Sequence, residues 1–402
     1  MHPMVKPALR RAWRSLTCAQ YGVAPAHAVV LDGVDAATGR LLGLMDGTRG
    51  TALLRREAAE LGLPEGRLDA LLGRLASAGL LVEAGAGRPG RAGPAAGAVD
   101  AALDPLRADL AALSVVGPEP DRALRTLAAR RERRVVVRGA GRVGAAVAAL
   151  LAAAGVGEVE VVDGGRVEPW ETAPGGLPAE AVGERRVAAA RRLVARWARG
   201  PVAVRRAGRR AGAGPGAGGV PVSLVVVAPR DGLGVRVPDP VAAEPWMAAG
   251  TPHLYAGVLE ATGVVGPLVL PGGTACARCL QEEATDRDPA WPRLLAQWRS
   301  GAPHPLPACD VALAAAVAGL AAGHALAFLD GELPASTGVR WEAAAPALGW
   351  RSERLVPHPA CPCGAARGRV GAGVSAAGEA RSTMAGRSPA RHGSLGIGGA
   401  HV

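Results

Sequence analysis

Aromatic side chains are scarce in this sequence: they make up 3% of the 402 residues, whereas hydrophobic residues make up 49%. The core must therefore be built mainly from Ala, Val and Leu. Lysine is nearly missing too, since Lys6 is the only one, and the formal net charge of +11 comes almost entirely from arginine. The arginines are spread over most of the chain among acidic residues, so charge alone does not indicate nucleic-acid binding.

The N-terminal stretch MHPMVKPALRRAWRSL has no apolar segment of the kind that a secretory signal carries. One apolar run, 311–329, is about long enough to cross a bilayer. It is mostly Ala and Gly, contains His324 and lies deep within a soluble-looking chain. We expect a buried helix there, and a cytoplasmic protein with no membrane contact.

The composition divides the chain into three parts and a tail. We expect a small winged-helix-like α+β domain at 1–84, a Gly/Pro/Ala linker at 85–100, an α/β domain at 101–364 and a disordered tail at 365–402. A further Gly-rich loop at 208–219 interrupts the main domain.

Within the first part, 17–22 and 28–31 have the character of short strands. The leucines at 68, 71, 72 and 75 recur at helical spacing, between a proline that suits a first helical turn and a glycine that suits a helix end. Helices followed by a short strand are typical of a winged-helix unit.

A glycine turn lies between two β-branched runs in VVVRGAGRVGAAVAALLAAAGVGEVEVVD, from Val135 to Asp163. Gly139, Gly141 and Gly144 form G-x-G-x-x-G, followed by an alanine-rich helix. Such a turn lets the backbone approach phosphates and directs free helix N–H groups at them. An aspartate that ends the second strand can accept hydrogen bonds from ribose hydroxyls. The alternative is an α/β core whose glycines serve packing alone.

This segment resembles the adenylate-forming ThiF/MoeB family, relatives of ubiquitin-activating enzymes, and LAAAGVGEVEVVD carries the resemblance better than the glycines do. It extends through AVGERRVAAARRL, VSLVVVAPRD and GPLVLPGGTACARC, over roughly 130–364. The resemblance implies a Rossmann-like nucleotide-binding domain. It also implies ATP-dependent activation of a peptide carboxylate, with cationic side chains on the phosphates and an aspartate on magnesium.

Several positions depart from the family pattern. The acidic stretch after the second strand reads Asp-Gly-Gly at 163–165, so one carboxylate is lost, and Glu171 and Pro174 stand in the segment that carries the family's asparagine and catalytic arginine. The family's lysine falls on Arg186, which cannot offer a compact ammonium. The magnesium aspartate matches Asp231. Because phosphate chemistry needs several fixed cations together, we expect turnover to be severely reduced.

Four of the six cysteines form two tight pairs, Cys276-x-x-Cys279 and Cys361-Pro-Cys363. Two such pairs suit tetrahedral Zn²⁺ in a structural site, because zinc accepts soft sulfur ligands and all four positions would be filled by protein. The C-x-C pair is tighter than usual, and His358 could replace one of its thiols. Free thiols are the alternative.

Cys309 stands just before the long apolar helix, where a helix N-terminus lowers a thiol pKa. Ubiquitin-activating enzymes use a nearby cysteine as a nucleophile. No histidine or second base follows at a suggestive spacing. A buried or incidental thiol is therefore the favoured interpretation.

The order of the parts resembles one branch, the ThiF-like partner proteins of azoline-forming cyclodehydratases, which modify thiazole/oxazole peptides. TGVVGPLVLPGGTACARCLQEEATDRDPAWPRLLAQW carries this resemblance most strongly. It implies that the N-terminal unit captures a leader peptide, often by strand pairing, while a separate partner consumes ATP. The strands at 17–22 and 28–31 are the candidate edge, with Arg55 and Arg56 available to an acidic leader.

The sequence thus favours a zinc-containing ThiF-like protein that presents a precursor peptide or small protein to a cyclodehydratase partner. Its glycine turn would be intact beside degenerate phosphate-handling positions, with ATP and Mg²⁺ as possible ligands. We expect a homodimer and no nucleic acid among its partners. The alternatives are an active adenylyltransferase that uses Asp163, Arg186 and Asp231, and a DNA-binding regulator.

Overall fold

The computed structural model describes residues 2–83, 104–198, 220–300 and 306–368. The expected linker, the loop at 208–219 and the expected tail beyond 368 lie outside these ranges. Where the tail was expected to begin, Ala365–Gly368 instead forms a helical turn, α14, and Ala365 is buried. The ordered chain therefore continues a few residues past 364.

The N-terminal unit is a three-stranded antiparallel sheet followed by three helices. The sheet has the order β2-β3-β4 and the helices pack leucines such as Leu41, Leu54 and Leu71 into one core. A separate ribbon pairs the first and last strands, β1 and β5. The elements are β1 Pro3–Val5, β2 Arg11–Ser15, β3 Cys18–Tyr21, β4 Val29–Asp32, α1 Ala36–Leu44, α2 Thr51–Glu60, α3 Arg67–Ser77 and β5 Leu81–Glu83.

The strands expected at 17–22 and 28–31 are present as β3 and β4, but the candidate edge needs a correction. Strand β3 is the central strand, hydrogen-bonded to β2 on one side and β4 on the other. It has no free edge for a peptide. The free edges of this sheet belong to β4 and to β2, a strand that the sequence pattern did not predict.

Two helices connect the N-terminal unit to the main domain. They are α5 Arg107–Val116 and α6 Arg122–Arg131, preceded by the short η1 Asp104–Leu106. Leu106 and Leu127 form a small core between them. A turn at Gly117 and Pro118 separates the two helices, because proline has no N–H for a helical hydrogen bond.

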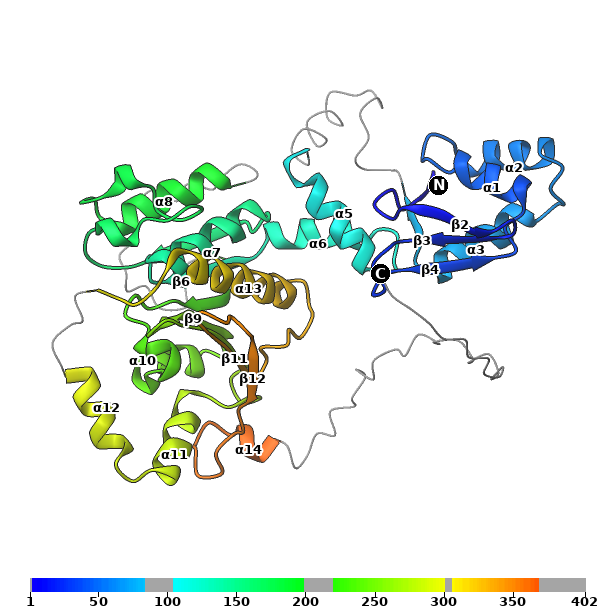
Figure 1. Cartoon of the computed structure of the whole chain (residues 1–402). Helices are drawn as coiled ribbons and strands as arrows, with labels where there is room; N and C mark the ends of the chain where they lie inside the picture. Colours follow the sequence, from blue (N-terminus) through cyan, green and yellow to red (C-terminus); the bar gives the residue numbers. More distant parts are fainter. Residues whose placement is uncertain (1, 84–103, 199–219, 301–305, 369–402) are drawn as a thin grey trace, which may run out of the picture.

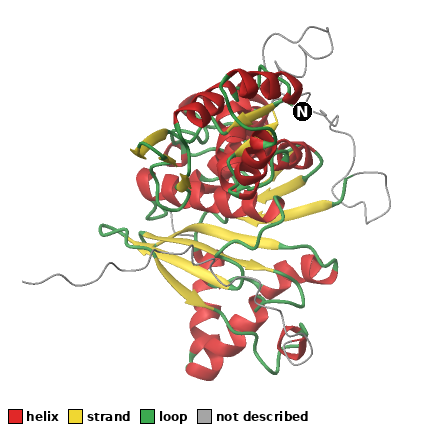
Figure 2. Ribbon diagram, turned by 90° about the vertical axis from the view of Figure 1, so that its right-hand side faces the viewer, coloured by secondary structure: helices red, strands yellow, loops and turns green. Residues whose placement is uncertain are grey.

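The main domain is built on a seven-stranded sheet of order β12-β11-β10-β9-β8-β6-β7, with helices on both faces (Figures 1 and 2). Strands β7, β6, β8 and β9 are parallel, and β10, β11 and β12 continue the sheet antiparallel. The bounds are β6 Arg134–Arg138, β7 Glu158–Val162, β8 Val222–Val227, β9 His253–Leu259, β10 Thr262–Val269, β11 Val339–Ala344 and β12 Arg351–Arg354. A mixed Rossmann-like α/β domain was expected and is observed.

One face of the sheet carries α7 Arg142–Ala153, α8 Arg186–Trp197 and α13 Val311–Leu329 (Figure 1). Helix α13 is the apolar run that is long enough to span a bilayer. Its residues Leu313, Val317 and Ala321 are fully or almost fully buried in the core against α7 and the central strands. Because the core contains small side chains and few aromatic ones, α7 and α13 must lie close to the sheet to fill it. Their alanine and glycine residues permit this close approach.

The opposite face carries α9 Leu233–Arg236, α10 Pro240–Ala248 and α11 Ala277–Arg287, with α12 Trp291–Ser300 beyond them. Val235, Tyr255 and Val264 form a second core there together with cysteine side chains. The glycine turn thus lies beside the core on one face of the sheet, and the cysteine cluster belongs to the core on the other face.

Candidate functional site

The glycine turn joins β6 to α7 at the carboxyl ends of the parallel strands. Gly139 has a φ of +109°, and a Cβ atom there would lie 1.9 Å from the carbonyl oxygen of Ala228. A Cβ on Gly144 would lie 2.0 Å from the carbonyl oxygen of Gly139. Both glycines are therefore required for packing, and Gly141 is the N-cap of α7. The free N–H groups of this helix end face the cleft where a dinucleotide fold holds phosphate.

Arg186 lies at the start of α8 and is the hub of a buried ion-pair cluster. Its guanidinium contacts Asp163 Oδ1 at 3.0 Å and Glu171 Oε2 at 2.7 Å, and all three side chains are at most 6% exposed. It also donates to the carbonyl oxygens of Gly164 and Arg166. These partners all lie in the loop that follows β7, so this loop is fixed by its bonds to the Arg186 guanidinium.

The charge of Arg186 is held firmly in this cluster. Burial alone works to lower its pKa, but the hydrogen bonds and negative charges of Glu171 and Asp163 outweigh burial and raise the pKa above the ordinary arginine value. Both carboxylates are therefore neutralised from within the protein.

Asp163, the expected ribose acceptor, is engaged on both oxygens. Its Oδ2 accepts from the backbone N–H of Ala140 at 2.6 Å, while Oδ1 meets Arg186. Asp163 therefore ties the second strand to the glycine turn. To bind a ribose it would have to give up or share one of these bonds.

The cleft beside the turn is narrow, with a volume of about 30 Å³. Its lining includes the turn itself, Trp170, Glu171, Arg230 and Cys309. Arg230 pairs with Glu171 Oε1 at 3.1 Å, so Glu171 holds two guanidinium groups at once. Asp231, the expected magnesium ligand, is exposed next to Arg230 and forms no hydrogen bond or ion pair within the described residues.

The role of Glu171 was not anticipated from sequence, where it was read only as the loss of a family residue. No change of charge at 186 pointed to this pair, because arginine and lysine carry the same charge. The pairing depends on the path of the loop between 163 and 186, which the sequence does not give.

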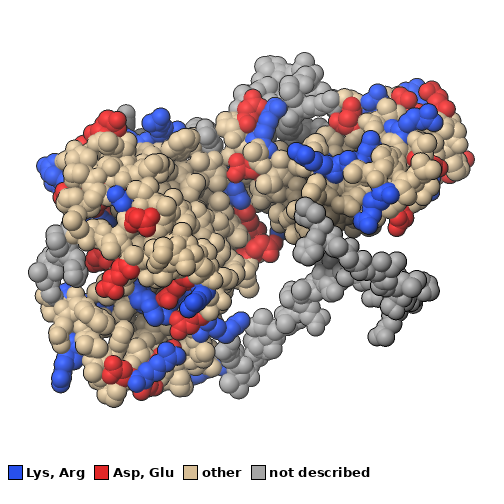
Figure 3. All heavy atoms as spheres, in the orientation of Figure 1, with Lys and Arg blue, Asp and Glu red and all other residues tan. Residues whose placement is uncertain are grey.

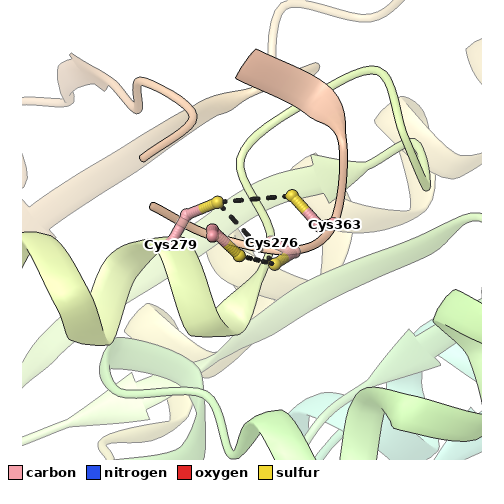
Figure 4. Close-up of side chains that lie close together, drawn as sticks. Cys276, Cys279 and Cys363 are labelled. Atoms are coloured by element: carbon pink, nitrogen blue, oxygen red, sulfur yellow. Dashed lines mark hydrogen bonds between the residues drawn. The ribbon is translucent and has the colours of Figure 1, made fainter. Parts of the chain in front are cut away.

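The four paired cysteines converge on one point on the opposite face of the sheet (Figure 4). Cys276 Sγ lies 3.8 Å from Cys279 Sγ and 3.7 Å from Cys361 Sγ, and Cys279 Sγ lies 3.6 Å from Cys363 Sγ. Zn–S bonds of about 2.3 Å in a tetrahedron place sulfur atoms about 3.8 Å apart. The distances match this edge length, so the cluster could hold a metal ion, and its donors suit zinc.

The surroundings of the cluster also fit a metal. Burial raises the pKa of Cys361 to about 11, and the hydrogen bond with Cys276, together with burial, raises the pKa of Cys279. Without a cation these thiols stay protonated, so metal binding must release protons. His358 is not needed as a ligand, because the four cysteine sulfur atoms already lie within 4.8 Å of one another. Its Nε2 contacts Asp286 Oδ2 at 2.9 Å.

Cys309 lies in the cleft and not in the cysteine cluster. Its carbonyl oxygen accepts from Arg142, the first residue of α7. Burial raises the pKa of its thiol, and the nearby charge of Arg142 offsets this only in part. A raised pKa is the opposite of what a nucleophilic cysteine needs.

The sequence and the structure were each compared with known proteins. The model of the ThiF family matches residues 113–364. Crystal structures of MccB from E. coli cover 90% of this chain and 99% of their own, at 14–15% identity; the TM-score is 0.62 for one with MccA and a nucleotide analogue, and 0.61 for one with ATP.

The structure of the heterocyclase TruD covers 91% of this chain and 43% of its own, at 16% identity and a TM-score of 0.54. None of the curated proteins matches the chain. At these identities the structural likeness shows the fold alone. The family model, which spans more than half of the sequence, shows that the chain belongs to the ThiF family.

Proposed function

We propose that this chain binds a precursor peptide or small protein through its N-terminal unit and presents it to a partner for ATP-dependent modification. The modification is of the azoline-forming cyclodehydratase type, and the chain's own nucleotide site is out of use. The observation that carries the proposal is the buried Arg186–Asp163–Glu171 cluster. Arg186, at the position where the family resemblance places a phosphate-binding lysine, is bound to these two carboxylates within the protein.

Parts of the cleft still fit ATP. The glycine turn and the N-terminus of α7 could approach phosphates, and the exposed Asp231 could hold Mg²⁺. The chemistry would also need free cations around the phosphates. Arg186 and Arg230 are both paired with Glu171, and Arg142, which also lines the cleft, donates to the carbonyl oxygen of Cys309, so each of these cations already has a partner within the protein. The residues present support weak nucleotide binding at most, and no adenylation.

The peptide-binding part of the proposal draws on the neighbours in fold. Solved structures of E. coli MccB include complexes with MccA, and TruD is a heterocyclase. In this chain, the outer edges of β2 and β4 offer unpaired backbone groups within the described part of the unit, and strand addition is a general way to capture an extended peptide. Arg55 pairs with Asp69 at 2.9 Å, which leaves Arg56 as the freer of the two candidate arginines.

Zinc has a structural role in this proposal. Cys276 and Cys279 begin α11, whereas Cys361 and Cys363 follow β12, so one ion would tie two segments about eighty residues apart in the chain. Four protein thiolates leave no position for a substrate. We further propose that the protein works as a homodimer together with a separate cyclodehydratase.

The test is binding of a labelled precursor peptide, taken from the genes beside this one, to the full-length protein by fluorescence anisotropy. Arg11→Pro on β2 and Val30→Pro on β4 remove an outward-facing backbone donor from each edge strand in turn, with folding checked by circular dichroism. One variant should weaken binding on the order of tenfold or more, and the other should not. Equal binding by both variants, or no binding by the intact protein, contradicts the proposal.

An active adenylyltransferase is the second candidate, and the exposure of Asp231 favours it. E. coli MccB has been solved with ATP. ATP–pyrophosphate exchange that disappears in Asp231→Ala would establish this alternative.

A DNA-binding regulator is less well supported. Arg67 and Arg74 of α3 donate to backbone carbonyls of Gly33 and Asp32 and are not free for phosphates. In the face shown in Figure 3, acidic and basic side chains are interspersed. Salt-dependent DNA binding by the full chain would revive this candidate.

A further inference from the structure

The only lysine of the chain lies at the contact between the N-terminal unit and the connecting helices. Lys6 directly follows β1 and is 1% exposed. Its backbone N–H donates to Leu80 at 2.9 Å, which continues the β1–β5 ribbon. Its Nζ donates to the carbonyl oxygen of Gly117 at 2.7 Å, across 111 residues of sequence.

The backbones on the two sides of this contact also touch. Gly79 has a φ of +67°, and a Cβ atom there would lie 3.2 Å from the Cα of Pro118. Lys6 and Gly79 therefore meet the Gly117–Pro118 turn together. A side chain larger than hydrogen at 79 would push the two parts apart.

The helices on the far side of the turn are firmly fixed to the main domain. Arg130 of α6 contacts Asp330 at 2.6 Å, with side chains 5% and 11% exposed, and donates to the carbonyl oxygen of Ala154. Its own carbonyl oxygen accepts from Gly157. Leu106 packs against Gly155. The two helices that the Gly117–Pro118 turn joins are thus tied to the main domain at their far ends.

Burying the Lys6 ammonium with a single hydrogen-bond acceptor costs free energy, because the group loses its hydration. Within the described residues Gly117 is the acceptor of its only hydrogen bond, although Nζ can donate three. Burial lowers the pKa of Lys6, which reflects this cost. An apolar side chain of similar length would avoid the desolvation of a charge, but it would form no hydrogen bond across the contact and would leave the carbonyl oxygen of Gly117 without this donor. The advantage of lysine at this position is therefore a directional hydrogen bond that fixes the orientation of the N-terminal unit.

We propose that Lys6 is a positioning residue, which fixes the N-terminal unit in one orientation on the Gly117–Pro118 turn. Loss of its hydrogen bond releases the unit while both parts stay folded. On the proposed function, this orientation delivers a bound peptide to a fixed place beside the main domain; the contact itself does not depend on that function.

The first test exploits the single lysine. An amine-reactive ester can label Lys6 and the N-terminal amine alone, and Arg10→Lys adds an exposed reference amine four residues away. In the full-length variant, labelling at 6 should be slower than at 10, on the order of tenfold or more. Pro118→Gly loosens the turn without changing any residue of the N-terminal unit, and should speed labelling at 6. Unchanged slow labelling at 6 in Pro118→Gly overturns the proposal, since Lys6 would then be protected by its own unit.

The second test measures the arrangement. Lys6→Met keeps the length and removes the charge, and Arg10→Met is the matched control on the same segment. By small-angle X-ray scattering, Lys6→Met should have a larger radius of gyration than the wild type, with Arg10→Met unchanged. Hydrogen exchange should show α1–α3 still protected. An unchanged radius in Lys6→Met, or loss of protection in α1–α3, contradicts a positioning role. Neither test contains peptide, so failure of peptide capture leaves their outcome untouched.

Discussion

At the scale of single residues, the main feature is Arg186, a buried cation whose charge is satisfied by hydrogen-bonding partners within the protein. Arg186 donates to two carboxylates and two carbonyl oxygens of the loop after β7. Buried ion pairs of this kind fix a unique local structure more than they add stability. The cluster therefore fixes the loop after β7 and satisfies the charge of Arg186 within the protein.

Removing this cation should be costly. Arg186→Met leaves Asp163 and Glu171 as two buried carboxylates without their partner, and should lower the free energy of unfolding by about 3–5 kcal/mol in urea denaturation. Arg192→Met on the same helix breaks an exposed pair with Glu184 and should cost at most about 1 kcal/mol. Equal losses in the two variants would show that the cluster is not the structural centre described.

His253 should make stability depend on pH. It is fully buried between Trp246 and Tyr255, and burial lowers its pKa below the ordinary value of 6.5. The folded state disfavours the charged form, so the stability that His253 contributes is complete above pH 6.5 and falls as the pH drops through the folded pKa.

The measurement is the free energy of unfolding of the wild type and of His253→Phe at a series of pH values. The variant lacks this titration, so the difference between the two proteins should shift in favour of the variant as the pH falls from about 7 to about 5. Other histidines titrate in both proteins and cancel. A difference that stays constant with pH contradicts a buried neutral His253.

At the scale of elements, long periodic segments could be predicted and short exposed ones could not. Helix α13 has the expected bounds and α7 lies directly after the glycine turn, as expected, because long runs of small apolar residues leave few other structures possible. Strand β2 was missed, since RAWRS is exposed at every position and shows no alternation. That omission also misplaced the peptide edge, because β3 becomes central only once β2 is known.

The glycine turn is an element whose packing can be tested separately from ligand binding. Gly144→Ala places a methyl group 2.0 Å from a backbone oxygen, and should lower the free energy of unfolding by roughly 3 kcal/mol or more. Gly319→Ala on α13 has open space around the new atom and should raise it by roughly 0.5–1 kcal/mol. A harmless Gly144→Ala would contradict the close approach of turn and helix.

The cysteine cluster predicts one zinc ion per chain. Cys361→Ser should abolish zinc in elemental analysis of purified protein and destabilise the segments that the cluster joins, whereas Cys18→Ser, far from the cluster, should keep it. A chelator should reproduce the effect of Cys361→Ser on the wild type. Zinc retained by Cys361→Ser, or absent from the wild type, counts against a four-thiolate site.

At the scale of the whole molecule, the family resemblance was sufficient to predict an α/β domain with a small N-terminal unit, as observed (Figure 1). The site could be predicted only as a set of positions. Asp163 and Arg186 were each assigned to a nucleotide, yet they bind one another, and a pairing between 163 and 186 depends on the path of the loop between them. The hydrogen bond from Lys6 to Gly117 could not be predicted from sequence patterns either, because the two residues are 111 positions apart.

The most direct test of the central claim is ATP–pyrophosphate exchange by the full-length, zinc-loaded protein with Mg²⁺ and its precursor peptide. Because the guanidinium at 186 is bound to Asp163 and Glu171, we expect no exchange above the background without protein, and the same result for Asp231→Ala. Exchange in the wild type that disappears in Asp231→Ala would contradict the claim, since the cleft would then be a working adenylation site.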